Sequence, residues 1–438
     1  MKKLFIILGL ATLASCKPNL QSETPTANGL DFSSYLAIGN SLTAGYADGS
    51  LYKSGQQNSY PAIFSNHTAQ FFGLHDFKQP LLMSEGGFPG PKLVLGYSTG
   101  CDGNTSLGPV PFLGGTDSSD FANISAQGPF NNMGIPGIRA IDYTMANYAL
   151  LANLFGYPYA SRMFTTSSAM PIDEAFRIAP TFFTMWLGSN DVLGYALGGG
   201  KGDPSQPLSP LNISNTAAFQ TAYEAVVKRL SQSGAKGVLL NIPEVTSIPF
   251  FTTIPPYGLV LDTAQAAGLN SIGLPEHFHA GSNNFVIEDV SLPSGRRQIR
   301  NDELLLLSIP QDSLKCALWG TAKPIPHQYV LDAGELANIR AATSTFNGII
   351  TNMSSLYNFP VVDMHAYLAT AVAGIKFNGA DFNTQFISGG AFSLDGVHLT
   401  PRGNALVVNQ IIHVVNGFYK STIPDVDVNS FPGIKFPK

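Results

Sequence analysis

Four short runs of apolar residues divide the chain into an alternating pattern. They read SYLAIGNS, APTFFTMWLGSND, KGVLLNIPEV and FPVVDMHAYL, at residues 34–41, 179–191, 236–245 and 359–368. Apolar runs of this length, without regular polar alternation, are typical of parallel strands that are buried on both faces of a sheet. The pattern therefore predicts a buried parallel sheet.

Segments with helical spacing separate these runs. Residues 214–237 carry apolar side chains every three or four positions and reach Gly234, a common helix terminator, near their end. A second segment of this kind, residues 332–357, precedes the fourth run. Alternation of strand and helix predicts an α/β fold in which helices connect parallel strands.

Two stretches depart from this alternation. Residues 46–131 and about 247–325 are rich in Gly, Pro, Asn and aromatic residues, and each is too long for a simple connection. We expect both to be large loop insertions packed over one end of the sheet. Ligands bind at the carboxyl ends of strands in such sheets, so the insertions are either pocket walls or surface decoration.

The amino-acid composition argues against a disordered protein and against a nucleic-acid-binding protein. The 438 residues are 44% hydrophobic and only 12% charged, with a net charge of −5. The hydrophobic content excludes a disordered chain. No basic block is present, which argues against nucleic acid as a partner.

The first residues, MKKLFIILGLATLASC, have the organisation of a secretory signal. Two lysines precede an apolar stretch, residues 4–13, which is too short to span a bilayer. The tetrapeptide LASC resembles the bacterial lipobox, and the alternative is an ordinary cleaved signal. The resemblance implies a signal peptide at 1–15 and an acylated Cys16, for example with palmitate. Lys17, in place of Asp, implies an outer-membrane destination.

Residues 17–30, KPNLQSETPTANGL, are polar and rich in helix breakers, so residues 16–30 are expected to form the lipidated cysteine and a flexible tether. The globular domain is expected at 31–438. With Cys16 lipidated, Cys101 and Cys316 remain as a pair in an oxidising compartment. They form either a disulfide or two buried thiols.

Several residues could together supply the chemistry of a hydrolase. Ser41 ends the first run, and Asp395 lies three residues before His398, close enough to orient its imidazole. Gly134, in a Gly/Pro turn, could present an outward N–H, and the Asn190 side chain could donate at the end of the second run. Taken singly, each is more typical of a turn than of a catalytic site.

In order, the segments GNSLTAG, NMGIPG, GSND and DGVH resemble the four blocks of the SGNH (GDSL-type) esterase and lipase family. The resemblance implies a three-layer α/β/α flavodoxin-like fold. It implies Ser41 as nucleophile, with Asp395 and His398 completing the triad. The oxyanion donors would be the N–H groups of Ser41 and Gly134 and the amide of Asn190. Asn40 stands where the family name has Asp, which puts only local loop geometry in doubt.

The same resemblance implies a serine ester hydrolase that needs no metal or organic cofactor. The aromatic, weakly charged insertions favour an apolar acyl group, as in a lipase or general carboxylesterase. A carbohydrate O-deacetylase and an inactive surface binding lipoprotein are the alternatives. We expect a monomer that acts on a small-molecule or lipid ester and is held to the membrane through Cys16.

Other residues offer competing chemistry. Ser98 lies in GYSTG, which matches the nucleophile elbow of α/β-hydrolases, but the following residues CDGNTSLGPV cannot form the required helix. Glu276, His277 and His279 could ligate a metal, although loop hydrogen bonding is the simpler explanation. His365 and Trp186 are expected to be structural.

Overall fold

A five-stranded parallel sheet lies at the centre of the computed structural model, which describes residues 24–73 and 76–437. Its strands, in sheet order, are β13 (Val361–Val362), β6 (Lys236–Leu240), β5 (Phe182–Trp186), β1 (Tyr35–Gly39) and β4 (Asn132–Gly134). All neighbouring pairs are parallel. The four predicted strands are therefore confirmed, and β4 is a fifth strand in the segment where the sequence predicts a Gly/Pro turn.

The strand order is that of a flavodoxin-like fold. Numbered along the chain, the five strands lie in the order 2-1-3-4-5, with β1 and β5 on the two sides of the point where the order reverses. Such a reversal opens a crevice at the carboxyl ends of the two strands. The residues that follow β1 and β5 are therefore placed where this fold binds ligands.

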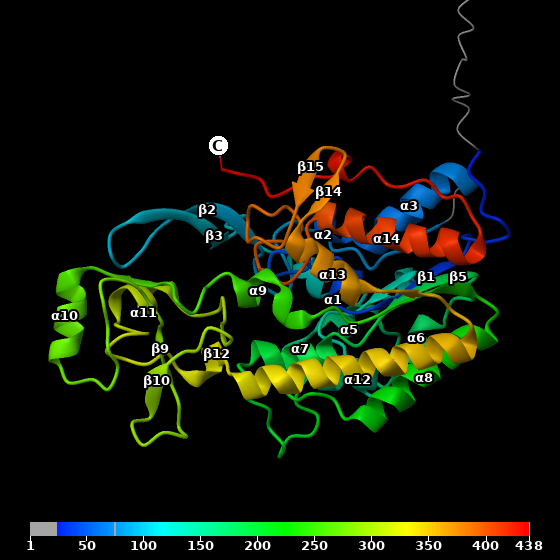
Figure 1. Ribbon diagram of the computed structural model, residues 1–438. Coiled ribbons are helices and arrows are strands. Elements are labelled where there is room, and N and C mark those ends of the chain that lie inside the picture. Colours follow the sequence, from blue (N-terminus) through cyan, green and yellow to red (C-terminus); the bar gives the residue numbers. More distant parts are fainter. Residues whose placement is uncertain (1–23, 74–75, 438) are drawn as a thin grey trace, which may run out of the picture.

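Helices cover both faces of the sheet (Figure 1). One face carries α3 (Tyr60–Phe72) and α14 (Pro401–Tyr419), and the other carries α7 (Asn190–Leu197), α8 (Thr216–Gln232) and α12 (Ala333–Tyr357). Helices α8 and α12 confirm the two predicted helices. The expected α/β class with helices around a parallel sheet is confirmed.

The first of the two stretches expected as insertions is only partly outside these layers. Helix α3 lies within residues 46–131, yet Tyr60, Ile63 and Phe64 are buried in the same core as α14. The prediction was too broad here, because a Gly- and Pro-rich context hid a helix with one apolar face. The rest of this stretch includes α2 (Lys53–Gln57) and a hairpin of β2 (Leu93–Thr99) and β3 (Thr105–Pro111).

The second stretch forms a lateral arm, residues 254–325, at one side of the sheet (Figure 1). It has a small core of its own around Phe285, Ile287 and Ile325. Its elements are β7 (Leu259–Leu261), α10 (Thr263–Ser271), β8 (Gly281–Asn283), β9 (Val286–Glu288), β10 (Arg296–Gln298), β11 (Leu304–Leu305) and α11 (Gln311–Cys316).

A disulfide between Cys101 and Cys316 joins the β2–β3 hairpin to this arm. The two Cα atoms are 6.4 Å apart and the cysteines are 215 residues apart in the chain. Of the two alternatives left open by the sequence, the structure has the disulfide. The bond connects the two stretches that flank the carboxyl end of the sheet.

The remaining elements are short. They are α1 (Ser41–Ala44), α4 (Tyr148–Leu154), α5 (Tyr159–Met163), α6 (Pro171–Ala175), α9 (Pro249–Thr252), β12 (Val330–Leu331), α13 (Met364–Ala373), β14 (Ile375–Phe377) and β15 (Ala380–Phe382), with 3-10 turns η1 (Ser118–Phe121), η2 (Ser125–Gln127), η3 (Ala140–Thr144), η4 (Val245–Ser247), η5 (His327–Tyr329) and η6 (Val428–Ser430). Among the described residues, no helix has both the length and the apolar character required to cross a membrane.

Candidate active site

Ser41 is the first residue of α1, directly after the buried strand β1. Asn40 caps this short helix, because its Oδ1 accepts a hydrogen bond from the Leu42 N–H at 3.1 Å. The asparagine thus makes the local turn contact expected of it. The N–H of a first helical residue has no acceptor within the helix, so that of Ser41 is available to a ligand.

Two glycines allow α1 to lie against the sheet. A Cβ at Gly39 would come within 1.9 Å of Thr43 Oγ1, and a Cβ at Gly134 would come within 2.2 Å of the Ala44 nitrogen. Any larger side chain would push α1 away. These glycines therefore fix the height of Ser41 above the strands.

His398 reaches Ser41 from the loop that precedes α14. Its Nε2 lies 2.8 Å from Ser41 Oγ, and its Nδ1 lies 2.8 Å from Asp395 Oδ2. Both distances are those of hydrogen bonds. The structure thus brings together three residues, Ser41, Asp395 and His398, that lie up to 357 positions apart in the sequence.

The Asp395 carboxylate is held by backbone and side-chain donors. Its Oδ1 accepts from the N–H groups of Val397 at 2.8 Å and of His398 at 2.9 Å. It also accepts from Ser393 Oγ at 3.0 Å, and Oδ2 accepts from the Gly49 N–H at 2.9 Å. Burial alone would raise the pKa of this carboxyl, but the charge of His398 and these hydrogen bonds lower it well below the usual range. Asp395 is therefore ionised and fixed in orientation.

The segment just after α1 is a part of the site that the sequence analysis missed. Besides the Gly49 N–H, it supplies Tyr46, whose ring centroid is 4.6 Å from that of His398. The Tyr46 hydroxyl donates to the Gly49 carbonyl at 2.5 Å, which keeps the ring in place. Burial, with the nearby Asp395 charge, raises the pKa of Tyr46 to about 12, so the ring is neutral at physiological pH. The only sequence signal was proximity to Ser41.

Asn190 is the first residue of α7, which is separated from the end of β5 by three residues. Its Nδ2 donates to the Ile138 carbonyl at 3.0 Å, which fixes the amide, and its second N–H has no acceptor among the described residues. The neighbouring Asp191 is fully buried and its Oδ2 accepts from the Ala140 N–H at 2.7 Å. Asp191 thus ties α7 to the loop that holds the Asn190 side chain.

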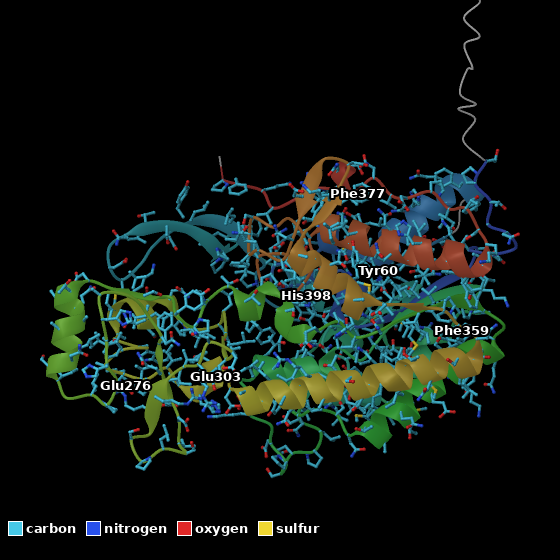
Figure 2. All side chains as sticks on the ribbon, viewed as in Figure 1. Tyr60, Glu276, Glu303, Phe359, Phe377 and His398 are labelled. Atoms are coloured by element: carbon cyan, nitrogen blue, oxygen red, sulfur yellow. A yellow bond between two sulfur atoms is a disulfide. The ribbon has the colours of Figure 1, made fainter. Side chains whose placement is uncertain are left out.

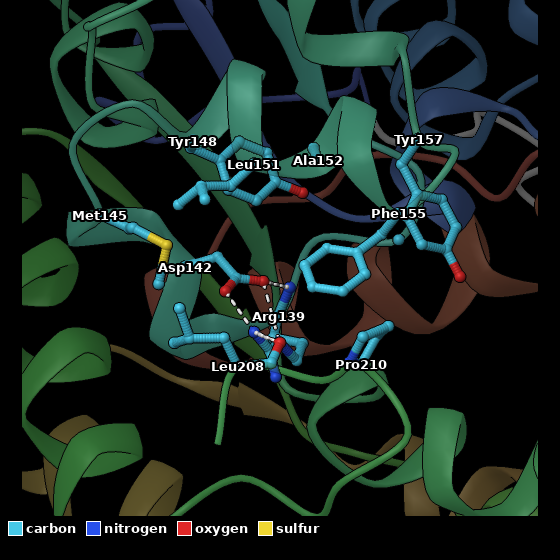
Figure 3. A pocket seen from close by; sticks show the side chains of 11 residues that line it. Arg139, Asp142, Met145, Tyr148, Leu151, Ala152, Phe155, Tyr157, Leu208 and Pro210 are labelled. Carbon is cyan, nitrogen blue, oxygen red and sulfur yellow. Dashed lines mark hydrogen bonds and ion pairs between the residues drawn. The ribbon is translucent and has the colours of Figure 1, made fainter. Parts of the chain in front are cut away.

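A buried ion pair reinforces this loop. Arg139 donates to both carboxylate oxygens of Asp142, at 3.0 and 2.8 Å, at the base of a small cavity (Figure 3). A bidentate pair of this kind has a defined geometry as well as a favourable energy. It fixes residues 138–142, on which Asn190 and Asp191 both depend.

The backbone N–H of Gly134 has a different partner from the one expected. Its N–H does not point outward but donates to Asn132 Oδ1 at 3.0 Å, in a buried environment. The Asn132 amide in turn donates to the Thr43 carbonyl at 2.9 Å, so that the contact is part of the joint between β4 and α1. The clearest role of Gly134 in this structure is steric.

A serine, a histidine and a carboxylate that contact one another in this order can be compared with the sites of known protein families. The family model of the GDSL-like lipases and acylhydrolases matches residues 35–411. The chain belongs to this family. The match runs from β1 into α14 and thus includes Ser41, Asn190 and His398. Among curated proteins, no sequence matches the chain.

Solved structures similar to this GDSL-family chain include three hydrolases. They are LAE5, an α/β hydrolase enzyme from the metagenome of Lake Arreo, Spain (11% identity, TM-score 0.35, covering 89% of this chain and 98% of that chain), the lipase/acylhydrolase from Enterococcus faecalis (11%, 0.33, 90% and 98%) and the extracellular lipase from Streptomyces rimosus (12%, 0.32, 88% and 98%).

The competing candidates lie apart from this site. Ser98 is on β2, and the chain continues into the antiparallel strand β3, so the helix required after a nucleophile elbow is absent there. The Glu276 carboxylate pairs with Arg296 at 3.0 Å, while His277 and His279 are exposed. Figure 2 shows Glu276 in the lateral arm, far from His398.

His365 and Trp186, the two residues expected to be structural, both form hydrogen bonds with Asn241. His365 is exposed near the start of α13, and its N–H donates to Asn241 Oδ1 at 3.1 Å. Trp186 is buried at the end of β5 and donates to the Asn241 carbonyl at 3.1 Å.

Within residues 24–73 and 76–437, the one group that could hold a metal ion is His327, Asp332 and Glu335, of which the two acids form the capping box of α12. Cys16 lies outside the described residues.

Proposed function

We propose that the protein is a serine ester hydrolase that cleaves carboxylic esters through an acyl-enzyme on Ser41. The observation that carries this proposal is the hydrogen-bonded chain from Ser41 Oγ through His398 to Asp395 at the switch point of the sheet. Membership of the GDSL-like lipase/acylhydrolase family supports the reaction class. The aromatic, weakly charged character of the chain favours a lipase or general carboxylesterase.

The contacts suggest a role for each group in the first half of the reaction. With its Nδ1 proton directed at Asp395, His398 has a free electron pair on Nε2 to accept the Ser41 hydroxyl proton. The serine oxygen then attacks the ester carbonyl carbon, while the ionised Asp395 stabilises the imidazolium. His398 returns the proton to the departing alkoxide, which leaves as the alcohol.

The second half repeats these steps with water as the nucleophile. His398 removes a proton from water, the hydroxide attacks the acyl-enzyme carbonyl, and the proton passes to Ser41 as the acid is released. The developing oxyanion would be stabilised by the Ser41 N–H and by the second N–H of the Asn190 amide. Gly134 can join these donors only by sharing its N–H with Asn132, so we assign the main stabilisation to the other two.

Hydrolysis of p-nitrophenyl butyrate tests the proposal. We expect turnover by the wild-type protein and a loss on the order of 10⁴- to 10⁶-fold in Ser41→Ala, as for other serine hydrolases that lack the nucleophile. Ser98→Ala is the matched control and should retain wild-type turnover. Loss of activity in Ser98→Ala but not in Ser41→Ala would overturn the assignment. Absence of wild-type turnover on all esters, with a folded protein, would favour a binding lipoprotein.

We further propose that Cys16 is acylated and anchors the domain to the bacterial outer membrane. The support is the sequence alone: a short apolar signal, the tetrapeptide LASC, and Lys17 after the cysteine. Incorporation of labelled palmitate into the protein in bacterial cells should be lost in Cys16→Ala. Equal labelling of both forms, or recovery of the wild-type protein in the soluble fraction, would contradict the anchor.

A further inference from the structure

We propose that Asp48 is a positioning residue of the active site, which holds Asp395 and His398 at hydrogen-bonding distance from Ser41. This inference rests on the proposed function, because it assumes that His398 accepts the proton of Ser41. Asp48 acts through the loop that carries Asp395, and not by contact with the substrate.

The loop of residues 393–400, which carries Asp395 and His398, has to be fixed relative to Ser41. Most of the hydrogen bonds to the Asp395 carboxylate come from other residues of the loop itself. Such bonds orient the carboxylate within the loop, but they do not set the distance between the loop and Ser41. Because His398 and Ser41 are 357 positions apart in the chain, that distance depends on contacts between segments.

Among the described residues, three hydrogen bonds join this loop to the turn that follows α1. Asp48 makes two of them, since its N–H donates to Ser393 Oγ and its Oδ1 accepts from the Leu394 N–H, both at 3.0 Å. The third runs from the Gly49 N–H to Asp395 Oδ2. Ser393 Oγ donates in turn to Asp395 Oδ1, so the Asp48 N–H and the Asp395 carboxylate belong to one series of hydrogen bonds.

The turn that carries Asp48 is itself held in place. Ala47 and Ser50 exchange backbone hydrogen bonds across it, at 3.1 and 3.0 Å, and the Asp48 carbonyl accepts from the Leu93 N–H at 2.7 Å. The hydroxyl of Tyr52, a buried residue, donates to Asp48 Oδ2 at 2.6 Å. Asp48 therefore connects a fixed turn to the loop of the catalytic acid and base.

A role in the turn alone does not account for the Asp48 side chain. Asp48 and Gly49 have φ angles of 54° and 76°, and Asp-Gly is a common pair in two-residue turns of this kind. Asn or Gly would serve such a turn equally well. The Asp48 carboxylate, however, bonds outside the two central residues of the turn, to Leu394 and Tyr52. The positioning role is therefore assigned to the side chain.

The charged groups around Asp48 guide the choice of substitutions. Burial raises the pKa of Asp48, and the nearby charge of Asp395 adds to the rise. Hydrogen bonds from Tyr52 and Leu394, with the charge of Lys92, act in the opposite direction. An asparagine at position 48 would keep the Oδ1 acceptor for the Leu394 N–H, tolerate the positive φ and remove a charge close to Asp395.

Two substitutions separate the contacts of the side chain from its charge. Asp48→Gly removes both side-chain contacts without backbone strain, and it should lower kcat for p-nitrophenyl butyrate about 10- to 100-fold, the order expected for a displaced catalytic group. KM should stay within about twofold of wild type, because the lost contacts act on the reacting groups and not on substrate binding. Asp48→Asn should recover most of the kcat lost in Asp48→Gly.

The matched control removes a side chain from a similar backbone position elsewhere. Asn378 is exposed in the turn between β14 and β15, with a φ of 45°. Asn378→Gly should keep the wild-type kcat and KM.

Two further measurements show whether Asp48 acts through Asp395. In an Asp395→Asn background, addition of Asp48→Gly should lower the remaining kcat by less than about threefold, because residues that act as a unit are not additive. The His398 Nδ1 proton, which is directed at Asp395, should give a downfield NMR resonance in wild type and Asp48→Asn that is weakened or lost in folded Asp48→Gly. A full additive loss of kcat, or an unchanged resonance in Asp48→Gly, would contradict the positioning role.

The outcomes separate failure of this inference from failure of the proposed function. A wild-type kcat in Asp48→Gly, with an active wild-type enzyme, would overturn the role of Asp48 alone. No hydrolysis and no labelling of Ser41 by a fluorophosphonate would overturn the proposed function itself. If Asp48→Gly does not fold, Tyr52→Phe removes the bond to Asp48 Oδ2 and should lower kcat about two- to tenfold, the order of one hydrogen bond. An unchanged kcat in Tyr52→Phe would then overturn the assignment.

Discussion

The carboxyl end of the sheet and the lateral arm both bury charged groups, but they compensate for them differently. In the arm, Arg297 contacts Asp289 and Glu303, each at 2.6 Å. Burial alone would raise the pKa of Glu303, but its contacts with Arg297 lower it instead, and hydrogen bonds lower the pKa of Asp289 to about 2. Arg300, 3.8 Å from Glu303, supplies a second positive charge, so the two carboxylates are matched by two arginines of the same segment.

At the carboxyl end of the sheet, Asp395 has no arginine or lysine among its contacts in the described chain. It is held by N–H groups, by the Ser393 hydroxyl and by His398, and the series of hydrogen bonds ends at Ser41 Oγ. The charged groups of the arm pair with one another, whereas the hydrogen bonds at the carboxyl end of the sheet lead to a hydroxyl that can react. Substitutions of the same chemical kind should therefore act very differently in the two regions.

The largest contrast is expected for loss of a carboxylate charge. Asp395→Asn should lower kcat on the order of 10⁴-fold, because an amide neither fixes the histidine tautomer nor stabilises the imidazolium. Asp289→Asn removes a charge in the arm and should leave kcat within about twofold of wild type. Steady-state kinetics on p-nitrophenyl butyrate measures both. Comparable losses in the two variants would show that the regions are not functionally distinct.

Two asparagines, one in each region, give the next comparison. Asn190 and Asn284 each donate from Nδ2 to a backbone carbonyl, that of Ile138 and that of Ile299. Asn190→Ala should lower kcat about 10²- to 10³-fold, the usual cost of one oxyanion donor. Asn284→Ala should leave kcat unchanged. A wild-type kcat in Asn190→Ala would remove this residue from the oxyanion hole.

The disulfide tests how far the two regions depend on each other. Replacement of both Cys101 and Cys316 by serine should lower the free energy of unfolding by about 2–4 kcal/mol, a typical disulfide contribution. It should change kcat by less than twofold, because the bond joins the hairpin to the arm and touches no triad residue. Chemical denaturation and kinetics provide the two readouts. A tenfold loss of kcat would mean that the arm shapes the active site.

The last prediction concerns the pH dependence of stability and rests on the buried carboxyl of Asp191. Burial raises its pKa to about 7, above an ordinary value of about 3.9. The folded state therefore retains a proton that the unfolded chain releases, and stability should fall as pH rises from about 4 to about 7. Asp191→Asn should flatten this decline in a series of thermal unfolding midpoints. An unchanged slope would assign the decline to other groups.

Much of the fold could be predicted because its signals are local. Four buried runs and two amphipathic segments gave strands and helices correctly. Strand β4 escaped because it has only three residues, Asn132–Gly134, within a turn-like sequence. Helix α3 escaped because it lies in a Gly- and Pro-rich stretch, and its apolar face packs on α14, which is distant in the chain.

In the site too, residues that belong to a local motif could be predicted, whereas residues placed by contacts between distant segments could not. Ser41, Asp395 and His398 carry recognisable motifs, and the structure brings these three together. The contacts of Gly49 and Tyr46 with Asp395 and His398 depend on how the chain after α1 turns, which no motif encodes. The contact of the Gly134 N–H with Asn132 could not be predicted for a similar reason, because Asn132 is part of a strand that the sequence did not reveal.

The most direct test of the account is to identify the residue that becomes covalently modified. The wild-type protein would be treated with a fluorophosphonate, digested, and analysed by mass spectrometry, with Ser41→Ala and Ser98→Ala in parallel. The account predicts one adduct, on Ser41, that is retained in Ser98→Ala and absent in Ser41→Ala. An adduct on Ser98, or equal labelling of wild type and Ser41→Ala, would contradict it.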